Sequence, residues 1–230
     1  DFVVFYKQTI LGPLWFIIQP IVYTLVFNLI FGQIAKISTD GIPSFLFYMS
    51  GTVTWSYFAI CLNATSNTFI QNSELFGKVY FPRLVVPISN VIFSVLQFII
   101  QFLIFIFFLN YFSYKGMLDV EISMYVLLLP LLILQMALLG LGFGILISAL
   151  TTKYRDLTFV MTFAVQTWMY LTPIVYPLSI AESKYRMFLI LNPMTSVVEC
   201  FRGIFFGISS IQLSEIFISI IVTLSVFVVG

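Results

Sequence analysis

The feature that most constrains this chain is a series of six long apolar runs that are almost free of charged residues. Each run is long enough for a transmembrane helix, which needs about 20 predominantly apolar residues. Each is too continuous for a strand of a membrane barrel, which spans with about 10 alternating residues. We therefore predict six transmembrane helices, at about residues 14–34, 45–70, 84–112, 122–150, 159–177 and 211–229.

The overall composition indicates the same solvent. Hydrophobic residues make up 61% of the 230 residues and charged residues make up 8%. Soluble domains have about 45–50% apolar and about 25% charged residues, so this chain has too few charges to cover a surface in water. The formal net charge of +1 gives no reason to expect nucleic acid as a partner. We expect an all-α integral membrane protein with one transmembrane domain over residues 1–230, surrounded by membrane lipids.

Two segments depart from the pattern of continuous spans. Residues 1–12 are short and aromatic, carry one lysine and end at a Gly–Pro pair, which predicts the end of an N-terminal interfacial helix. Residues 177–207 are apolar but interrupted by prolines and charges. This favours a re-entrant helical pair before the last span, because broken backbone at membrane depth must lie against protein or a water cavity. The alternative is a surface loop with one amphipathic helix.

The orientation in the membrane follows only weakly from charge. Six spans put both ends of the chain on one side, and the ten Lys and Arg residues divide evenly between the two sides. The shorter segments on the N-terminal side favour a cytoplasmic N-terminus. The chain begins Asp-Phe and stops within an apolar run, so we expect further residues beyond both ends.

The sequence lacks the residues that common catalytic and metal sites require. It contains no histidine, and Cys61 and Cys200 are far apart, so neither a metal site nor a disulfide framework is expected. No phosphate-binding GxxxxGK[ST] motif occurs, because Val79 follows the Gly77–Lys78 pair. We therefore expect a chain that is not an enzyme, binds no cofactor itself, and receives any energy for transport from a partner.

Residues 77–87, GKVYFPRLVVP, concentrate charge and proline between two apolar runs. They predict a short amphipathic turn between the second and third spans, which contacts water or another protein. The alternative is that Lys78 and Arg83 only anchor the span ends at lipid phosphates.

Five phrases in a fixed order carry a family resemblance. They are YKQTILGPLWFIIQP (6–20), KVYFPRLVVP (78–87), KYRDL (153–157), TPIVYP (172–177) and LNPMTSVVECFRGIFFG (191–207). Together they resemble the type-2 ABC exporter permeases that move polysaccharides such as O-antigen (the polymer of lipopolysaccharide), capsule and teichoic acid. The resemblance implies a multi-pass protein of the bacterial inner membrane, with a cytoplasmic N-terminus and six spans. It also implies a homodimer with two copies of an ABC ATPase subunit, which binds ATP and Mg, and a lipid-linked polysaccharide as substrate.

The resemblance also assigns contact residues for the ATPase subunit. Residues 69–83 match the family's coupling-helix region, and residues 154–156 match a second cytoplasmic contact between the fourth and fifth spans. The expected ATPase-coupling residues are Asn72, Glu74, Lys78, Arg83, Tyr154, Arg155 and Asp156.

Aromatic residues make up 18% of the chain and are candidates for the wall of a sugar channel. The C–H faces of sugar rings can lie on aromatic rings, so a polymer could slide along such a wall. The candidates lie in spans one, two and five: Tyr23, Phe27, Trp55, Tyr57, Trp168 and Tyr170. The alternative for each is a place facing lipid, another helix or the membrane interface.

Other polar and small residues in the apolar segments have more general roles. Glu199 and Arg202 stand three apart and can pair on one helix face, either to line or brace an exit gate or as a structural ion pair. Packing between helices is the favoured role for the amide residues in the spans and for the two GxxxG sequences at 140–144 and 203–207. The amide residues considered are Gln19, Asn28, Asn63, Gln97, Gln101, Gln135 and Gln166.

Three other functions stay open from the sequence. An exporter of the same fold could carry a drug, a lipid or another small molecule. A transporter or channel could work without an ATPase, but the internal repeat of spans and the buried ionisable residues that it would need are not evident from the sequence. A membrane glycosyltransferase or acyltransferase would need a cluster of acids or a histidine, which the sequence lacks.

Overall fold

A computed structural model describes residues 14–68, 82, 84–118, 124–153 and 156–230. These residues form helices and no strands, in agreement with the predicted all-α fold class. The predicted interfacial helix at 1–12 lies outside the described residues. The elements are α2 (Trp15–Phe27), the π-helix η2 (Asn28–Ile34), α3 (Ser44–Ser66), α6 (Val85–Tyr114), the 3-10 helix η3 (Met124–Leu128), α7 (Leu129–Lys153), α8 (Leu157–Tyr170), the 3-10 helix η4 (Leu178–Ile180), α9 (Ser183–Leu191), α10 (Pro193–Phe206) and α11 (Leu213–Val229).

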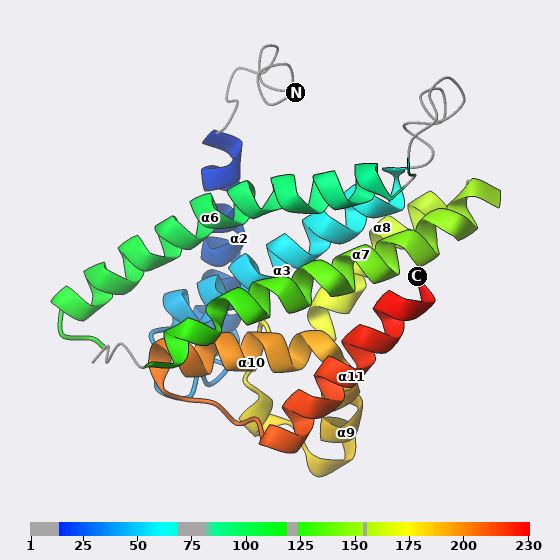
Figure 1. Cartoon of the computed structure of the whole chain (residues 1–230). Helices are drawn as coiled ribbons and strands as arrows, with labels where there is room; N and C mark the ends of the chain where they lie inside the picture. The colour runs from blue at the N-terminus through cyan, green and yellow to red at the C-terminus, as the bar shows by residue number, and fades with distance from the viewer. Residues whose placement is uncertain (1–13, 69–81, 83, 119–123, 154–155) are drawn as a thin grey trace.

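The helix α3 lies at the centre of the bundle. Figure 1 shows α3, α6 and α7 side by side, and α3 also packs against α2 and α10. Most of the 23 residues of α3 are therefore buried. The 30-residue helix α6 lies at the outside and buries one stripe at helical spacing. That stripe consists of Pro87, Val91, Ser94, Phe98, Gln101, Phe105 and Leu109.

Glycines of α7 set its distance from two neighbouring helices. A Cβ atom on Gly140 would lie 2.6 Å from the Cβ of Cys61, and one on Gly144 would lie 2.4 Å from the Cβ of Thr65, both on α3. On the opposite side, a Cβ on Gly142 would lie 3.0 Å from the backbone of Phe227 on α11. The predicted packing role of residues 140–144 is confirmed, because only glycine lets the backbones approach this closely.

The second GxxxG sequence has a different structure. Gly207 has φ 68° and ends α10 in the left-handed conformation that glycine adopts without strain. A Cβ atom on Gly207 would have no neighbour within 4 Å. The prediction that residues 203–207 form a helix-packing site is therefore wrong at Gly207, which ends a helix.

Four of the predicted spans correspond to helices that are long and apolar enough to cross a membrane. They cover Trp15–Ile34, Ser44–Ser66, Val85–Tyr114 and Met124–Thr151. The last run, α11, is apolar but only 17 residues long. The described residues thus contain four candidate spans, or five if the bent pair of α9 and α10 counts as one. The count of six stays a prediction.

The fifth predicted span is shorter than expected. The helix α8 has 14 residues and ends at Tyr170, so the prediction of a continuous span to residue 177 is wrong. Pro173 is the physical reason, because the residue before a proline is driven out of the helical conformation. Residues 171–176 instead turn back into the bundle, where Thr172, Pro173 and Ile174 are buried.

Residues 183–206 form two short helices, α9 and α10, whose axes are bent by 92° at Asn192. The side chain of Asn192 accepts a hydrogen bond from the backbone N–H of Met194 at 3.1 Å, and Pro193 occupies the first helical position. The amide of Asn192 also donates to the Thr172 hydroxyl at 2.9 Å, which ties the bend to the end of α8. The predicted pair of helices is confirmed, and its re-entry from one membrane surface stays a prediction.

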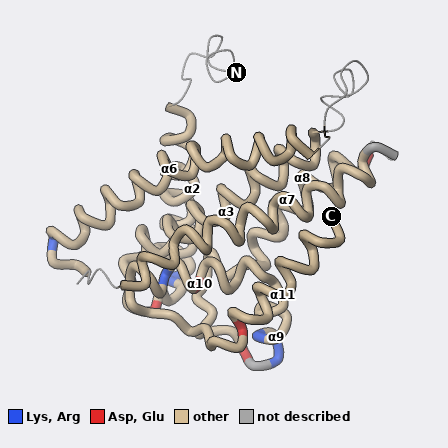
Figure 2. The backbone as a smooth tube through the Cα atoms, viewed as in Figure 1, with Lys and Arg blue, Asp and Glu red and all other residues tan. Residues whose placement is uncertain are grey.

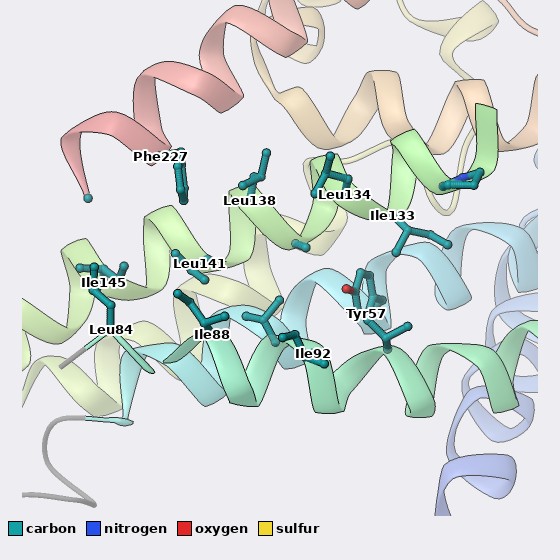
Figure 3. A pocket seen from close by; sticks show the side chains of 15 residues that line it. Tyr57, Leu84, Ile88, Ile92, Ile133, Leu134, Leu138, Leu141, Ile145 and Phe227 are labelled. Carbon is teal, nitrogen blue, oxygen red and sulfur yellow. The ribbon is translucent and has the colours of Figure 1, made fainter. Parts of the chain in front are cut away.

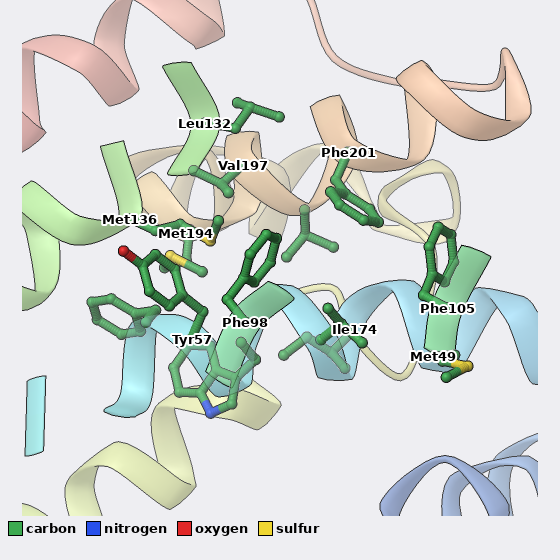
Figure 4. Packing of buried hydrophobic residues seen from close by; sticks show 14 of the residues in the cluster. Met49, Tyr57, Phe98, Phe105, Leu132, Met136, Ile174, Met194, Val197 and Phe201 are labelled. Atoms are coloured by element: carbon green, nitrogen blue, oxygen red, sulfur yellow. The ribbon is translucent and has the colours of Figure 1, made fainter. Parts of the chain in front are cut away.

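The helix α10 is buried among the longer helices. Figure 4 shows Met194, Val197 and Phe201 facing side chains of α3, α6 and α7. The ring of Phe105 on α6 lies 5.3 Å from the ring of Phe201 and 5.2 Å from that of Phe205. Because α10 is enclosed in this way, its charged residues must find partners inside the protein.

Candidate functional site

A cavity of about 490 Å³ lies between α2, α3 and α8. Each helix contributes one stripe of residues three or four positions apart, which is the spacing of one helix face. The stripe on α2 includes Gln19 and Tyr23, and the stripe on α8 includes Thr162, Gln166 and Tyr170. The stripe on α3 consists of Thr52, Trp55, Ser56, Ala59, Ile60 and Asn63. Amide, hydroxyl and aromatic groups from three helices therefore share one space.

The polar groups of this cavity are neutral and largely free to bind a ligand. Within the part of the chain that the structure describes, the side-chain amides of Gln19, Asn63 and Gln166 form no hydrogen bonds. Thr52 and Thr162 are different: the Thr52 hydroxyl bonds to the Met49 carbonyl at 3.0 Å and to Thr24 at 3.1 Å, and the Thr162 hydroxyl donates to the Thr158 carbonyl at 3.1 Å. An amide both donates and accepts hydrogen bonds, so three amides together suit a ligand rich in hydroxyl groups.

Four of the six aromatic channel candidates line this cavity: Tyr23, Phe27, Trp55 and Tyr170. Tyr23 and Tyr170 are each 51% exposed, so these parts of the cavity wall are accessible from outside the chain. Phe27 and Trp55 are each 5% exposed and form part of the inner wall.

The other two aromatic candidates lie elsewhere. Trp168 packs behind the cavity wall, with its ring 6.1 Å from Trp55, 5.2 Å from Phe58 and 5.1 Å from Phe143. It joins α8 to α3 and α7. Tyr57 is fully buried, with its ring 5.1 Å from that of Phe98 on α6. The structure therefore does not bring these two side chains together with the other four.

Sequence reasoning favoured helix packing for the amide residues, and this holds for two of them. The Gln135 amide on α7 donates to the Ser219 hydroxyl on α11 at 2.7 Å, and Asn28 accepts a bond from Ser44 at 2.7 Å. The cavity residues Gln19, Asn63 and Gln166 do not follow that expectation. A signal existed in the sequence, because Thr162, Gln166 and Tyr170 repeat every four residues in a mostly apolar run.

A larger cavity, of about 580 Å³, lies between α6, α7 and α11. Figure 3 shows that its wall is built from aliphatic side chains such as Ile88, Ile92 and Leu138, with Phe227 at one side. The Tyr57 hydroxyl is the main polar group that reaches it. Such a wall has almost no groups that could form hydrogen bonds with a hydrophilic ligand. The cavity between α2, α3 and α8 is therefore the better candidate, although it is smaller.

Glu199 and Arg202 form an ion pair inside the bundle. The Arg202 Nη1 donates to a Glu199 carboxylate oxygen at 3.1 Å, and the two side chains are 4% and 2% exposed. The predicted pairing is therefore confirmed. The same nitrogen donates to the Pro173 carbonyl at 2.7 Å, and Nη2 donates to the Ile174 carbonyl at 3.1 Å. These bonds fasten α10 to the turn that follows α8.

The remaining groups of Arg202 reach α3. Its Nη2 lies 3.5 Å from the Phe47 carbonyl, Nε lies 3.4 Å from the Ser50 hydroxyl, and the guanidinium lies 3.6 Å from the centre of the Phe47 ring. Glu199 accepts a further bond from the backbone N–H of Ser210 at 3.3 Å. One buried arginine thus joins three parts of the chain, a brace that spacing alone did not reveal.

The predicted ATPase-coupling residues Asn72, Glu74, Lys78, Arg83, Tyr154 and Arg155 lie outside the described residues. Asp156 is described and exposed at the start of α8. The flanking helix ends are placed: α3 ends and α6 begins at the end of the bundle where α7 ends and α8 begins (Figure 1). A hydrogen bond of 3.3 Å from Asn90 to the Thr68 hydroxyl joins two of these ends. Both predicted contact segments therefore connect helices at the same end.

The described residues contain no cluster of three or more His, Cys, Asp or Glu side chains that could hold a metal ion. The candidate site is the cavity between α2, α3 and α8, which neutral polar and aromatic groups line.

Known proteins with similar sequences indicate the family of this chain. Residues 1–206 match the profile of the ABC-2 type transporter family. An O-antigen export system permease protein RfbA of Klebsiella pneumoniae is 27% identical over 206 residues, which cover 89% of this chain and 76% of that protein.

Two further relatives have similar coverage. A protein of the same name from Myxococcus xanthus is 27% identical, over 87% of this chain and 75% of that protein. The polysialic acid transport protein KpsM of Escherichia coli is 24% identical, over 84% of this chain and 72% of that protein. The family profile matches most of the length of the chain, and four of the described helices are long and apolar enough to span a membrane. The chain therefore belongs to the ABC-2 type transporter family.

Proposed function

We propose that this chain is the transmembrane subunit of an ATP-driven exporter that moves a lipid-linked polysaccharide across the bacterial inner membrane. The observation that carries the proposal is the family match over residues 1–206, together with relatives named for O-antigen export and polysialic acid transport. The cavity between α2, α3 and α8 supports it, because amides and aromatic rings are suited to sugar hydroxyls and sugar rings.

The proposed assembly is a homodimer with six spans per subunit and two copies of an ABC ATPase subunit. ATP and Mg bind to that partner, and the chain itself is not an enzyme. The coupling helix within residues 69–83 and the second contact at 154–156 face the ATPase from the cytoplasm. The common position of the flanking helix ends supports this arrangement, because both segments then meet one partner (Figure 1).

The proposed mechanism transmits ATP-driven closure of the ATPase subunits through these contacts to spans one, two and five. Those spans correspond to α2, α3 and α8, the helices that line the cavity. The attachment of α8 suits such a movement, since Val165 is its only buried residue and Trp168 forms its main aromatic contacts. For ATP to drive the change, its bound and free states must favour different arrangements of the helices.

In the proposed exporter, residues 177–207 form the re-entrant pair at the exit side, and Glu199 with Arg202 braces it. The hydrogen bonds of Arg202 to Pro173 and Ile174 support a brace rather than a channel wall, because the guanidinium is buried among protein groups.

The first experiment is purification of the tagged protein from its native host in mild detergent, with mass spectrometry of the chains that remain bound. We expect an ABC ATPase in a stoichiometric amount, and we expect Lys78→Glu to release it. Asp156→Ala is the companion variant for the second contact. If no ATPase co-purifies in several detergents, the proposal fails and an ATP-independent transporter becomes the better explanation.

An exporter of a small molecule is the second candidate function. A cavity of about 490 Å³ falls within the range of small-ligand sites, about 300–1,000 Å³. The two functions are separated by measuring which compounds, lipid-linked glycans or small amphiphiles, stimulate ATP hydrolysis by the purified complex.

A further inference from the structure

The cavity between α2, α3 and α8 is polar but carries no charge. Among the described residues that line it there is no Lys, Arg, Asp or Glu. The three helices themselves contain none of these residues, and Figure 2 shows them without charged positions. The wall therefore offers hydrogen bonds and aromatic faces but no counter-ion.

The polar groups of the wall match neutral sugar units. Each amide of Gln19, Asn63 and Gln166 can donate to one sugar hydroxyl and accept from another. The exposed rings of Tyr23 and Tyr170 lie on the stripes that carry Gln19 and Gln166, so they can contact the apolar faces of sugar rings. A neutral repeat unit can thus exchange its bonds to water for bonds to the wall.

An acidic repeat unit would meet a different situation in this space. A carboxylate or phosphate that leaves water is strongly disfavoured unless a cation or several hydrogen-bond donors replace its hydration. The helices around the cavity supply no cation, and a polymer would meet this cost again at every charged unit that passes. The relatives do not decide between the two kinds of cargo, since one is named for polysialic acid and others for O-antigen.

We propose that this cavity selects a polymer of uncharged sugar units over acidic polymers such as polysialic acid or phosphate-linked chains. The inference rests on the proposed function, since it names the class of polysaccharide that the exporter carries. Gln166 is a specificity residue in this account, because it is exposed within the cavity at the middle of the α8 stripe.

The test uses the complete complex with its ATPase subunit, reconstituted in lipid nanodiscs. Two probes are compared on the same isoprenoid carrier: an oligomer of a neutral hexose and an oligosialic acid of similar length. We expect the neutral oligomer to stimulate ATP hydrolysis, and the acidic oligomer to need a concentration on the order of a hundredfold higher for the same effect.

A pair of matched variants locates the selectivity. Gln166→Lys adds a cation to the cavity and should lower the concentration of oligosialic acid that is needed by about tenfold or more. Gln97→Lys is the control, because it makes the same change at a half-buried position of α6 that does not line the cavity. We expect this control to leave the preference for the neutral oligomer unchanged.

The possible results separate the inference from the function on which it rests. Equal stimulation of the unaltered complex by both oligomers would overturn the inference and leave polysaccharide export standing. A matching change of preference in Gln97→Lys would overturn the assignment to this cavity. Failure of both oligomers to stimulate ATP hydrolysis would overturn export of glycans and the inference with it. The comparison on the unaltered complex needs no variant to fold.

Discussion

Replacing Arg202 with methionine should strongly destabilise the protein, because it leaves Glu199 as a buried charge without a cation. The Glu199 side chain is 4% exposed, and its remaining bond is to the Ser210 backbone N–H at 3.3 Å. Removing one partner of a buried ion pair costs about 3–5 kcal/mol. The Pro173 and Ile174 carbonyls also lose their bonds of 2.7 and 3.1 Å to Arg202. We therefore expect Arg202→Met to lower the free energy of unfolding by at least about 3 kcal/mol.

The assay is equilibrium unfolding of purified protein in mild-detergent micelles by titration with a denaturing detergent. The matched control is Arg186→Met, which breaks the ion pair of 3.2 Å with Glu215, where the arginine side chain is 29% exposed. The Glu215 side chain is only 9% exposed, but it keeps a bond of 3.0 Å from the Gln212 backbone N–H, and water reaches the place of the removed arginine, so we expect a smaller loss than from Arg202→Met. A loss from Arg202→Met no larger than that of the control would refute the reasoning.

A double variant tests whether the charge itself is the cause. Glu199→Gln combined with Arg202→Met leaves no buried charge, so we expect it to recover about 1–3 kcal/mol relative to Arg202→Met alone. If instead the double variant loses as much stability as the sum of the losses from Glu199→Gln alone and Arg202→Met alone, the two residues are not energetically coupled. If the double variant is stable and still exports polymer, the pair is only a structural brace and has no role in gating.

Three further predictions concern helix packing. Gly144→Ala places a Cβ 2.4 Å from that of Thr65 and should lower the free energy of unfolding by about 1–3 kcal/mol in the same titration. The control Gly203→Ala, whose nearest contact is 3.0 Å away, should lower it less. Equal losses of stability from the two variants would contradict the role of the α3–α7 contact. Gln135→Leu removes the bond of 2.7 Å to Ser219 and should lower the free energy of unfolding by about 0.6–1.7 kcal/mol. Gln97→Leu should leave that free energy almost unchanged. A larger loss of stability from Gln97→Leu than from Gln135→Leu would contradict the packing role of Gln135. Trp168→Ala should loosen α8, seen as faster hydrogen exchange in residues 157–170, while Phe159→Ala, at a site 81% exposed, should leave the exchange unchanged.

Several parts of the fold could be predicted because they depend on local pattern. The four long spans follow from uninterrupted apolar length, and the pairing of Glu199 with Arg202 follows from their spacing on one helix turn. The close approach at Gly140 and Gly144 also follows from spacing, because two small residues four apart leave a groove on one helix face. The end of α8 was missed although Pro173 marked it, since the apolar run continues beyond the helix.

The candidate site was only partly predictable. Four of the six aromatic residues line the cavity. Tyr57 and Trp168 lie on two of the helices that form it, α3 and α8, but their rings pack against other side chains outside the cavity. The amides of Gln19, Asn63 and Gln166 were expected to pack between helices, as Gln135 does. Nothing local distinguishes these amides from Gln135, because the difference lies in which helix stands opposite each of them.

That this is a helical membrane protein, and where its longest spans lie, follows from composition and from the length of the charge-free runs. Which face of each helix is buried against protein, lines a cavity or is exposed follows only from the packing of the helices. In water, hydrophobic periodicity separates inside from outside, but here both environments are apolar, so the spans are apolar on every side. The cavity between α2, α3 and α8 and the bonds of Arg202 to distant residues therefore emerge only when the helices are packed together.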